Sequence, residues 1–145
     1  MAAEFRKIIA PIDGSKEAKK AARKALYMAK HMDLEVVALY VVDTSLLAKF
    51  PAPEDVTSFD IDKFLQKEGL DALDEVEEMG REMGVKVEKK MVEGIPDQEI
   101  IEMAHQKDLI VMGSKGMTAL DRILIGSVSE KVMHHAPCPV MIVRG

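Results

Sequence analysis

The stretch from Lys7 to Val42, KIIAPIDGSKEAKKAARKALYMAKHMDLEVVALYVV, decides the fold. It opens with a short apolar run that contains two isoleucines, and the turn residues Asp13-Gly14-Ser15 end that run. Apolar residues, most of them alanines, then recur at helical spacing over residues 18–32, as in a helix that lies close to a sheet. Val36–Val42 is apolar without alternation, which is typical of a strand covered on both faces. The stretch predicts a strand, a helix and a second, parallel strand.

The rest of the chain continues to alternate between strands and helices. The further elements expected are a loop over residues 43–58, an amphipathic helix over 61–83, a half-exposed strand over 85–88, a helix that begins at Pro96, a buried strand over 109–112, a short helix over 127–134 and a last strand over 140–143. This alternation predicts a three-layer α/β/α sandwich around a five-stranded parallel sheet. A half-exposed third strand belongs at an edge and the short apolar first strand at the centre, so the predicted strand order is 3-2-1-4-5.

Length and composition indicate one ordinary globular domain over residues 1–145. The chain has 48% hydrophobic and 31% charged residues, and 20 Lys+Arg against 25 Asp+Glu give a net charge of −5. An acidic balance excludes a non-specific nucleic-acid binder, which needs a basic face. The apolar runs fall well short of the ~20 residues that span a bilayer, and a single cysteine favours a reducing compartment. We therefore expect a cytoplasmic protein with neither a nucleic-acid nor a membrane partner.

Two turn-rich stretches follow the first and fourth strands, at the point where the predicted strand order switches direction. In open α/β sheets, ligands bind at the carboxyl ends of the strands at such a point. After the fourth strand come Gly113-Ser114-Lys115-Gly116, nine residues, and then Gly126-Ser127. Glycines let a ligand approach the backbone, and amides at the start of a helix bind anions. The spacing matches neither a Walker loop nor the GxGxxG dinucleotide fingerprint.

The same residues also have a purely structural interpretation. Ser127 followed by Glu130 forms a capping-box pattern, with Ser127 at the cap of the helix. The glycines would then only permit a tight exit from the strand. Spacing alone leaves phosphate binding and this structural role open, and the two are compatible.

Asp13 likewise has two interpretations. It can be a turn residue that leads, with Ser15, into the first helix. Because it follows the central strand, its carboxylate can instead accept hydrogen bonds from ribose hydroxyls or hold a metal that bridges to phosphates.

Three motifs together resemble the universal stress protein family. They are PIDGS at residues 11–15, GIPDQEI at 94–100 and VMGSKGMTALDRILIGSVSEKVMHHAPCPVMIVR at 111–144. The resemblance covers essentially the whole chain, and the glycine spacing is similar to that of the ATP-binding, UspA-like branch. It implies the adenine nucleotide alpha hydrolase-like fold and an ATP site between the first and fourth strands.

By this resemblance, the phosphates would bind at the glycine loop, the ribose at Asp13 and the adenine along the backbone around Pro11, Ile12 and Val41. The expected nucleotide-binding residues are Pro11, Ile12, Asp13, Ser15, Val41, Met112, Gly113, Ser114, Gly116, Gly126, Ser127, Val128 and Ser129. The ligand would be ATP, ADP or AMP, with or without Mg²⁺ or Mn²⁺, and Asp13 is the candidate metal ligand. One departure is Tyr40, where many members of the family carry histidine.

The family resemblance also implies a homodimer that pairs through the last strand. The residues concerned are Val140, Met141, Ile142 and Val143. A bare apolar edge strand promotes aggregation, which is an independent reason to expect it to be covered.

Three functions remain open from the sequence. The favoured one is a dimeric, ATP-binding stress-response regulator that acts on a protein partner and hydrolyses ATP slowly at most. The second is a metal-dependent ATP phosphohydrolase or phosphotransferase, although no pair of residues forms a catalytic motif for it. The third is a dimer scaffold that binds no nucleotide. The adjacent His134 and His135 and the lone Cys138 are interpreted as structural.

Overall fold

The computed structural model describes residues 4–45, 58–115 and 125–145. The elements, in chain order, are β1 (Lys7–Ile12), α1 (Lys16–Met32), β2 (Val36–Asp43), α3 (Ser58–Met83), β3 (Val87–Gly94), α4 (Pro96–Met103), β4 (Asp108–Gly113), α5 (Ser127–His135) and β5 (Val140–Val143). All strand pairs are parallel, and the strand order is β3-β2-β1-β4-β5. The predicted architecture and strand order are confirmed.

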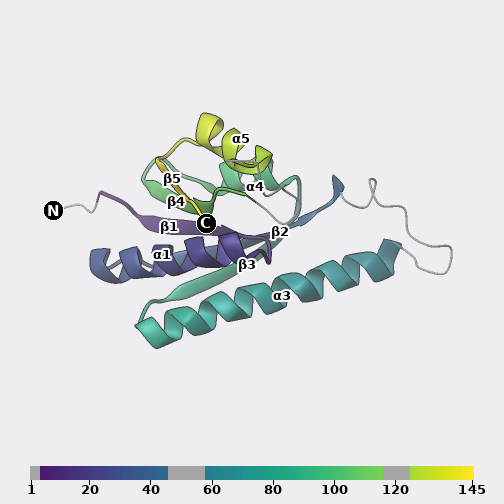
Figure 1. Ribbon diagram of the computed structural model, residues 1–145, viewed down its shortest axis with the longest axis horizontal. Helices are drawn as coiled ribbons and strands as arrows, with labels where there is room; N and C mark the ends of the chain where they lie inside the picture. Colours follow the sequence, from purple (N-terminus) through teal and green to yellow (C-terminus); the bar gives the residue numbers. More distant parts are fainter. Residues whose placement is uncertain (1–3, 46–57, 116–124) are drawn as a thin grey trace.

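The sheet lies between two helical layers, with α1 and α3 on one face and α4 and α5 on the other (Figure 1). Strands β1, β2 and β4 are buried because helices cover both of their faces. Alternate residues serve the two layers: Ile8 belongs to the core under α1 and α3, whereas Ile9 belongs to the core under α4 and α5. The register pairs Ile8 with Val36 of β2 and with Leu109 of β4.

Helix α1 is shaped by its alanine face and by its two ends. The side chain of Ser15 caps the helix by accepting the N–H of Ala18 at 3.1 Å, and Asp33 ends it in the left-handed region with φ 55°. The buried face consists of Ala18, Ala21, Ala22, Ala25, Leu26 and Ala29. Small side chains bring α1 close to the sheet, as the sequence predicted.

Strand β3 lies at an edge of the sheet and is half exposed, as expected, but its predicted bounds of 85–88 are wrong. Gly84 has a φ of +74° and Val85 donates its N–H to the carbonyl of Gly80, so both residues belong to the end of α3. The strand begins at Val87 and continues to Gly94 through charged residues. An edge strand tolerates charged residues because one of its faces meets water.

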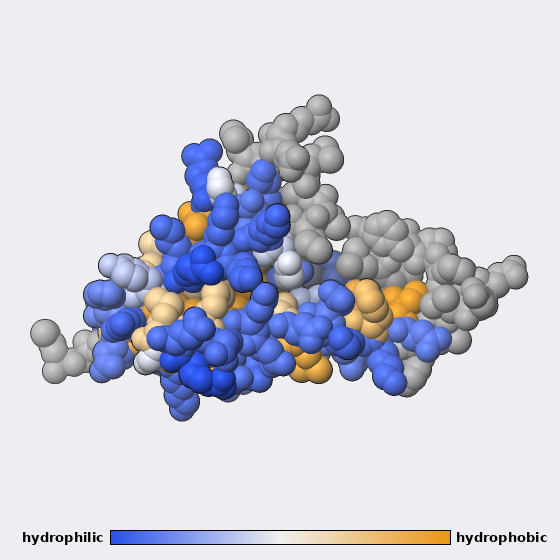
Figure 2. Space-filling view, turned by 60° about the horizontal axis from the view of Figure 1, so that its bottom comes forward, coloured by the Kyte–Doolittle hydropathy of each residue, from blue (hydrophilic) through white to orange (hydrophobic). Residues whose placement is uncertain are grey.

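The face formed by α1 and α3 presents a mostly hydrophilic surface with small apolar groups between the charges (Figure 2). Among the helices that the structure describes, none is both long enough and apolar enough to cross a membrane. The loop expected over residues 43–58 lies largely outside the described residues; only its first residues, up to Ser45, and Ser58 are described.

Candidate functional site

A cavity of about 370 Å³ opens at the carboxyl ends of the central strands. Its walls come from β1, β2 and β4, from helices α3, α4 and α5, and from the turns that follow β1 and β4. This is the switch point between β1 and β4, where open α/β sheets bind ligands. The volume falls in the range of small-molecule sites, which run from about 300 to 1,000 Å³.

Asp13 stands at this cavity directly after β1. Its Oδ1 atom accepts the N–H of Ser15 at 2.9 Å, so its carboxylate closes the turn between β1 and α1. Gly14, the residue between them, has a φ of +86°, which favours glycine. The turn role predicted for Asp13 is therefore observed, with Ser15 at the cap of α1, and Asp13 also lines the cavity.

The start of α5 is fastened to the end of β4. The hydroxyl of Ser129, which is buried, donates to the carbonyl of Gly113 at 2.8 Å. The N–H of Gly126 donates to the carbonyl of Ser114 at 2.5 Å, and the N–H of Ser114 donates to Val143 of β5 at 3.1 Å. These bonds fix the first turn of α5 beside the cavity, which Val128 and Ser129 line.

The capping box predicted at Ser127 is wrong. The N-cap of α5 is Gly126, whose backbone is extended at φ −79° and ψ 164°, and Ser127 is the first helical residue. The N–H of Glu130 donates to the carbonyl of Gly126, and no side chain caps the helix. The amides before Glu130 precede the first intrahelical hydrogen bond, so this end of the helix carries the partial positive charge that attracts anions.

The predicted nucleotide residues divide into three groups in the structure. The cavity is lined by Pro11, Ile12, Asp13, Val41, Met112, Gly113, Val128 and Ser129. Four more residues adjoin the lining along the chain but are not part of it: Ser15, Ser114, Gly126 and Ser127. Gly116 lies outside the described residues.

Sequence reasoning missed the wall that α3 contributes. Phe64, Leu65 and Glu68 line the cavity together with Tyr40 of β2. The sequence does contain a signal for it, because Gly69 interrupts an otherwise good helical sequence. A Cβ at position 69 would come within 2.6 Å of the Tyr40 ring, so the glycine marks a close contact between α3 and β2.

Charges are distributed unevenly around the cavity. Burial raises the pKa of the Tyr40 hydroxyl, and the nearby carboxylates of Asp13 and Glu68 raise it further. Lys115 lines the cavity on the side of β4 and α5. The acidic groups of the lining therefore come from α3 and the turn after β1, and the lysine comes from the segment after β4.

No group of three or more His, Cys, Asp or Glu side chains within the described ranges is arranged to hold a metal ion. His134 and His135 are exposed in the last turn of α5, with ring centroids 6.4 Å apart. Burial and, secondarily, Asp108 raise the pKa of the Cys138 thiol, which disfavours the reactive thiolate.

The model of the universal stress protein family matches residues 4–144. The chain belongs to the universal stress protein family. It is 46% identical to universal stress protein MJ0531 of Methanocaldococcus jannaschii over 97% of this chain and 82% of that protein. It is 37% identical to universal stress protein YxiE of Bacillus subtilis over 97% of this chain and 99% of that protein.

Solved structures have the same fold. The chain superimposes on hypothetical protein MJ0577 with a TM-score of 0.79 and 31% identity, over 98% of this chain and 97% of the other. A universal stress protein in complex with cAMP has a TM-score of 0.70 at 22% identity, over 97% of each chain. One from Archaeoglobus fulgidus in complex with dAMP has a TM-score of 0.62 at 19% identity, over 95% and 97%. The last two likenesses show the fold alone.

Proposed function

We propose that this universal stress protein binds an adenine nucleotide, ATP first and ADP or AMP as alternatives, in the cavity between β1 and β4. In this proposal it acts in the cytoplasm as a dimeric, nucleotide-dependent stress-response regulator and hydrolyses ATP slowly at most. One observation carries the proposal: the Asp13 carboxylate and the N-terminus of α5 face one cavity of about 370 Å³ at the switch point of the sheet.

Two features of the cavity lining suit two parts of a nucleotide, the ribose and the phosphates. A carboxylate such as Asp13 can accept hydrogen bonds from ribose hydroxyls. The first turn of α5 offers backbone amides and positive partial charge to phosphates, and Lys115 adds a cation. The apolar side chains of Val41, Ile100 and Met112 also line the cavity, and a flat base can pack against them.

The remaining predicted residues are assigned by the same proposal. The glycine-loop residues Gly113, Ser114, Gly116, Gly126 and Ser127 would bind the phosphates with Val128 and Ser129, and Pro11 and Ile12 would bind the base. A bound Mg²⁺ or Mn²⁺ would neutralise phosphate charge, with Asp13 as the protein ligand. Relatives of the same fold in complex with cAMP and dAMP support an adenine nucleotide as the ligand class.

The dimer would form through β5. This strand pairs with β4 on one side and ends the described sheet, and the side chain of Met141 is 40% exposed. An exposed apolar edge strand is a ready template for pairing with a second copy. Sedimentation of the wild type should show a dimer. Met141→Glu should weaken the dimer, because it places a negative charge on each of the two β5 strands that would pair.

Calorimetric titration of ATP, with and without Mg²⁺, tests the nucleotide proposal. We expect saturable binding by the wild type, strong loss in Gly126→Val and a weaker complex in Asp13→Asn, whose amide oxygen preserves the turn to Ser15. The matched control is Asp71→Asn, which removes the same charge from an exposed position on α3. Absence of binding by a folded wild type would leave the scaffold function in its place.

A further inference from the structure

The wall that α3 and β2 form has no part in the nucleotide set predicted from the sequence. It consists of Tyr40, Phe64, Leu65 and Glu68, which line the same cavity as Lys115 and the first turn of α5. Two of these residues carry polar groups, the Tyr40 hydroxyl and the Glu68 carboxylate. This wall therefore adds chemistry that the glycine loop and Asp13 do not supply.

Tyr40 occupies a fixed place in this wall. Its ring is 9% exposed and lies against the helix backbone at Gly69, where an added Cβ would meet ring atoms at 2.6 and 2.8 Å. The hydroxyl is close enough to Asp13 and Glu68 for both carboxylates to act on it electrostatically. One carboxylate comes from β1 and the other from α3, so the two chain segments place negative charge around the same point of the cavity.

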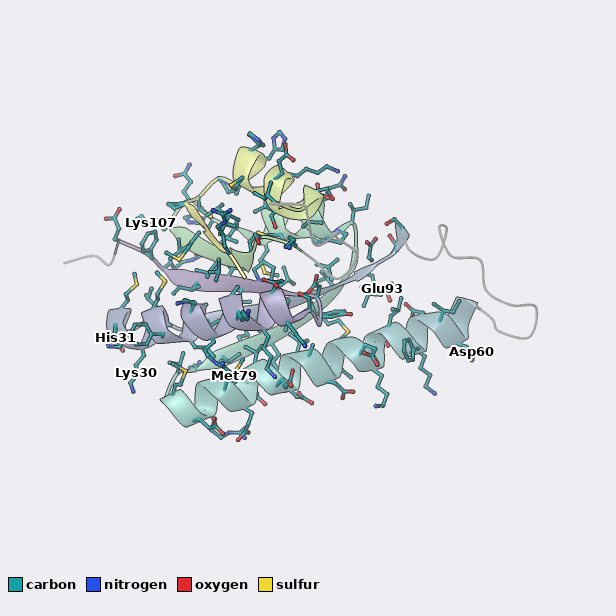
Figure 3. All side chains as sticks on the ribbon, viewed as in Figure 1. Lys30, His31, Asp60, Met79, Glu93 and Lys107 are labelled. Carbon is teal, nitrogen blue, oxygen red and sulfur yellow. The ribbon has the colours of Figure 1, made fainter. Side chains whose placement is uncertain are left out.

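Helix α3 is tied to the sheet on both sides of this wall. The side-chain amide of Gln66 donates at 3.3 Å to Glu93 of β3, which Figure 3 labels, and the Lys89 ammonium donates to Asp74 at 2.9 Å. Glu68 lies between Gln66 and Asp74 along the helix. Its backbone is therefore held in place even though its side chain is exposed to solvent.

An unmodified ribose suits this side of the cavity, because its 2′- and 3′-hydroxyls are donors for carboxylates. A phosphate on the ribose would instead be an acceptor with negative charge beside Asp13 and Glu68. Like charges within one cavity repel, and the repulsion is stronger in a partly enclosed site than in bulk water.

Building on the proposed nucleotide site, we infer that Glu68 is a specificity-determining residue, which admits adenine nucleotides with a free ribose and disfavours those with a 3′-phosphate. Tyr40 is a positioning residue, since its ring holds α3 and hence Glu68 at the cavity. In this arrangement the first turn of α5 binds the 5′-phosphates, and Glu68 on α3 distinguishes a free ribose from one that carries a 3′-phosphate.

The test compares adenosine 5′-monophosphate with adenosine 3′,5′-bisphosphate by calorimetry at low salt. The two probes differ only in the 3′-phosphate. We expect the wild type to bind the monophosphate more tightly, and Glu68→Gln to narrow that preference by about three- to tenfold, as for one screened like-charge contact. Glu82→Gln, a matched change at an exposed position further along α3, should leave the preference unchanged.

The outcomes separate the inference from the function on which it rests. A preference that is absent, reversed or equally strong in Glu68→Gln overturns the inference and leaves the nucleotide site intact. A wild type that binds neither these probes nor ATP overturns the proposed function, and the inference with it. A wild type that binds ATP but neither probe overturns the inference alone. Higher salt should also narrow the preference of the wild type, which a purely steric exclusion would not show.

Discussion

Gly69 of α3 and Tyr40 of β2 are in such close contact that a Cβ on Gly69 would lie 2.6 Å from the Cδ1 atom of the tyrosine ring. Real Cβ atoms essentially never approach another heavy atom so closely. The glycine therefore lets a helix and a strand meet beside the cavity. Burying the Tyr40 ring there also fixes where α3 crosses the carboxyl end of β2.

Replacing this glycine with alanine should destabilise the protein. Overpacking costs about 1–3 kcal/mol and alanine regains about 1 kcal/mol of helix propensity, so we expect a net loss of about 1 kcal/mol. Urea unfolding measures the change. In a Tyr40→Val background the ring is gone, and only the flexible Met91 side chain, whose Cε atom would lie 2.7 Å from the added Cβ, still has to shift, so the loss caused by Gly69→Ala should shrink. The same loss in both backgrounds would show that the contact with Tyr40 is not its cause.

Asp108 anchors the opposite end of the sheet. Its carboxylate is fully buried and accepts hydrogen bonds from Arg6 at 3.2 and 3.3 Å, from Lys7 at 3.1 Å and from the N–H of His105 at 2.9 Å. Burial raises the pKa of Asp108, but the His105 amide, Lys7 and Arg6 together lower it more, so the net shift is downward.

We expect Asp108→Asn to lower the free energy of unfolding by about 2–3 kcal/mol at neutral pH. Breaking a fully buried ion pair costs ~3–5 kcal/mol, and the loss here is smaller because Arg6 is half exposed. A lowered folded-state pKa means that this stabilisation is complete above the unfolded value of about 3.9 and is lost as the pH falls through the folded value. The difference between wild type and variant should therefore shrink in acid. Asp74→Asn, at an exposed pair with Lys89, should change stability by less than about 1 kcal/mol and serves as the control.

The spacing of apolar residues was sufficient to predict those helices and strands whose burial is evident from their own sequence. The alanine face of α1 and the unbroken apolar run of β2 each specify one kind of environment, and both predictions are confirmed. The bounds of β3 were wrong because exposure at an edge, rather than local pattern, lets charged residues continue the strand.

The α3 wall of the cavity could not be predicted for a different reason. The periodicity of α3 identifies an apolar face, but it does not say which strand that face crosses or which turn reaches the cavity. Phe64 and Glu68 line the same cavity as Tyr40 only because tertiary packing brings α3 to it. At α5, the extended backbone of Gly126 moved the helix start by one residue, and this was enough to remove Ser127 from the cap.

The observed start of α5 predicts that alanine substitutions at its two serines change the stability of the protein by different amounts. Ser129→Ala deletes the buried hydrogen bond to the Gly113 carbonyl and should cost about 1–2 kcal/mol in the free energy of unfolding. Ser127 is exposed and does not cap the helix, so Ser127→Ala should change stability by about 0.5 kcal/mol or less. A capping box would make Ser127→Ala costly as well, by about 1 kcal/mol. Thermal and urea unfolding of the two variants decide between these arrangements.

The titration of Tyr40 checks the electrostatics of the α3 wall without any ligand. The chain has two tyrosines and no tryptophan, so in Tyr27→Phe the ultraviolet signal of tyrosinate reports on Tyr40 alone. Burial, then Asp13, then Glu68 raise the pKa of this hydroxyl, and the midpoint should lie above the ordinary value of about 10. Because the folded-state pKa is raised, the stabilisation from the neutral hydroxyl is complete below about pH 10 and is lost as the pH rises through the folded value.

Adding Glu68→Gln should lower the midpoint of the Tyr40 titration while leaving it above 10, since burial is the larger cause of the raised pKa. Adding Glu82→Gln should not move this midpoint. Circular dichroism at each pH shows that the titrating protein is still folded. A midpoint that does not respond to Glu68→Gln would mean that the carboxylate is too far from Tyr40 to act on the ribose side of the cavity.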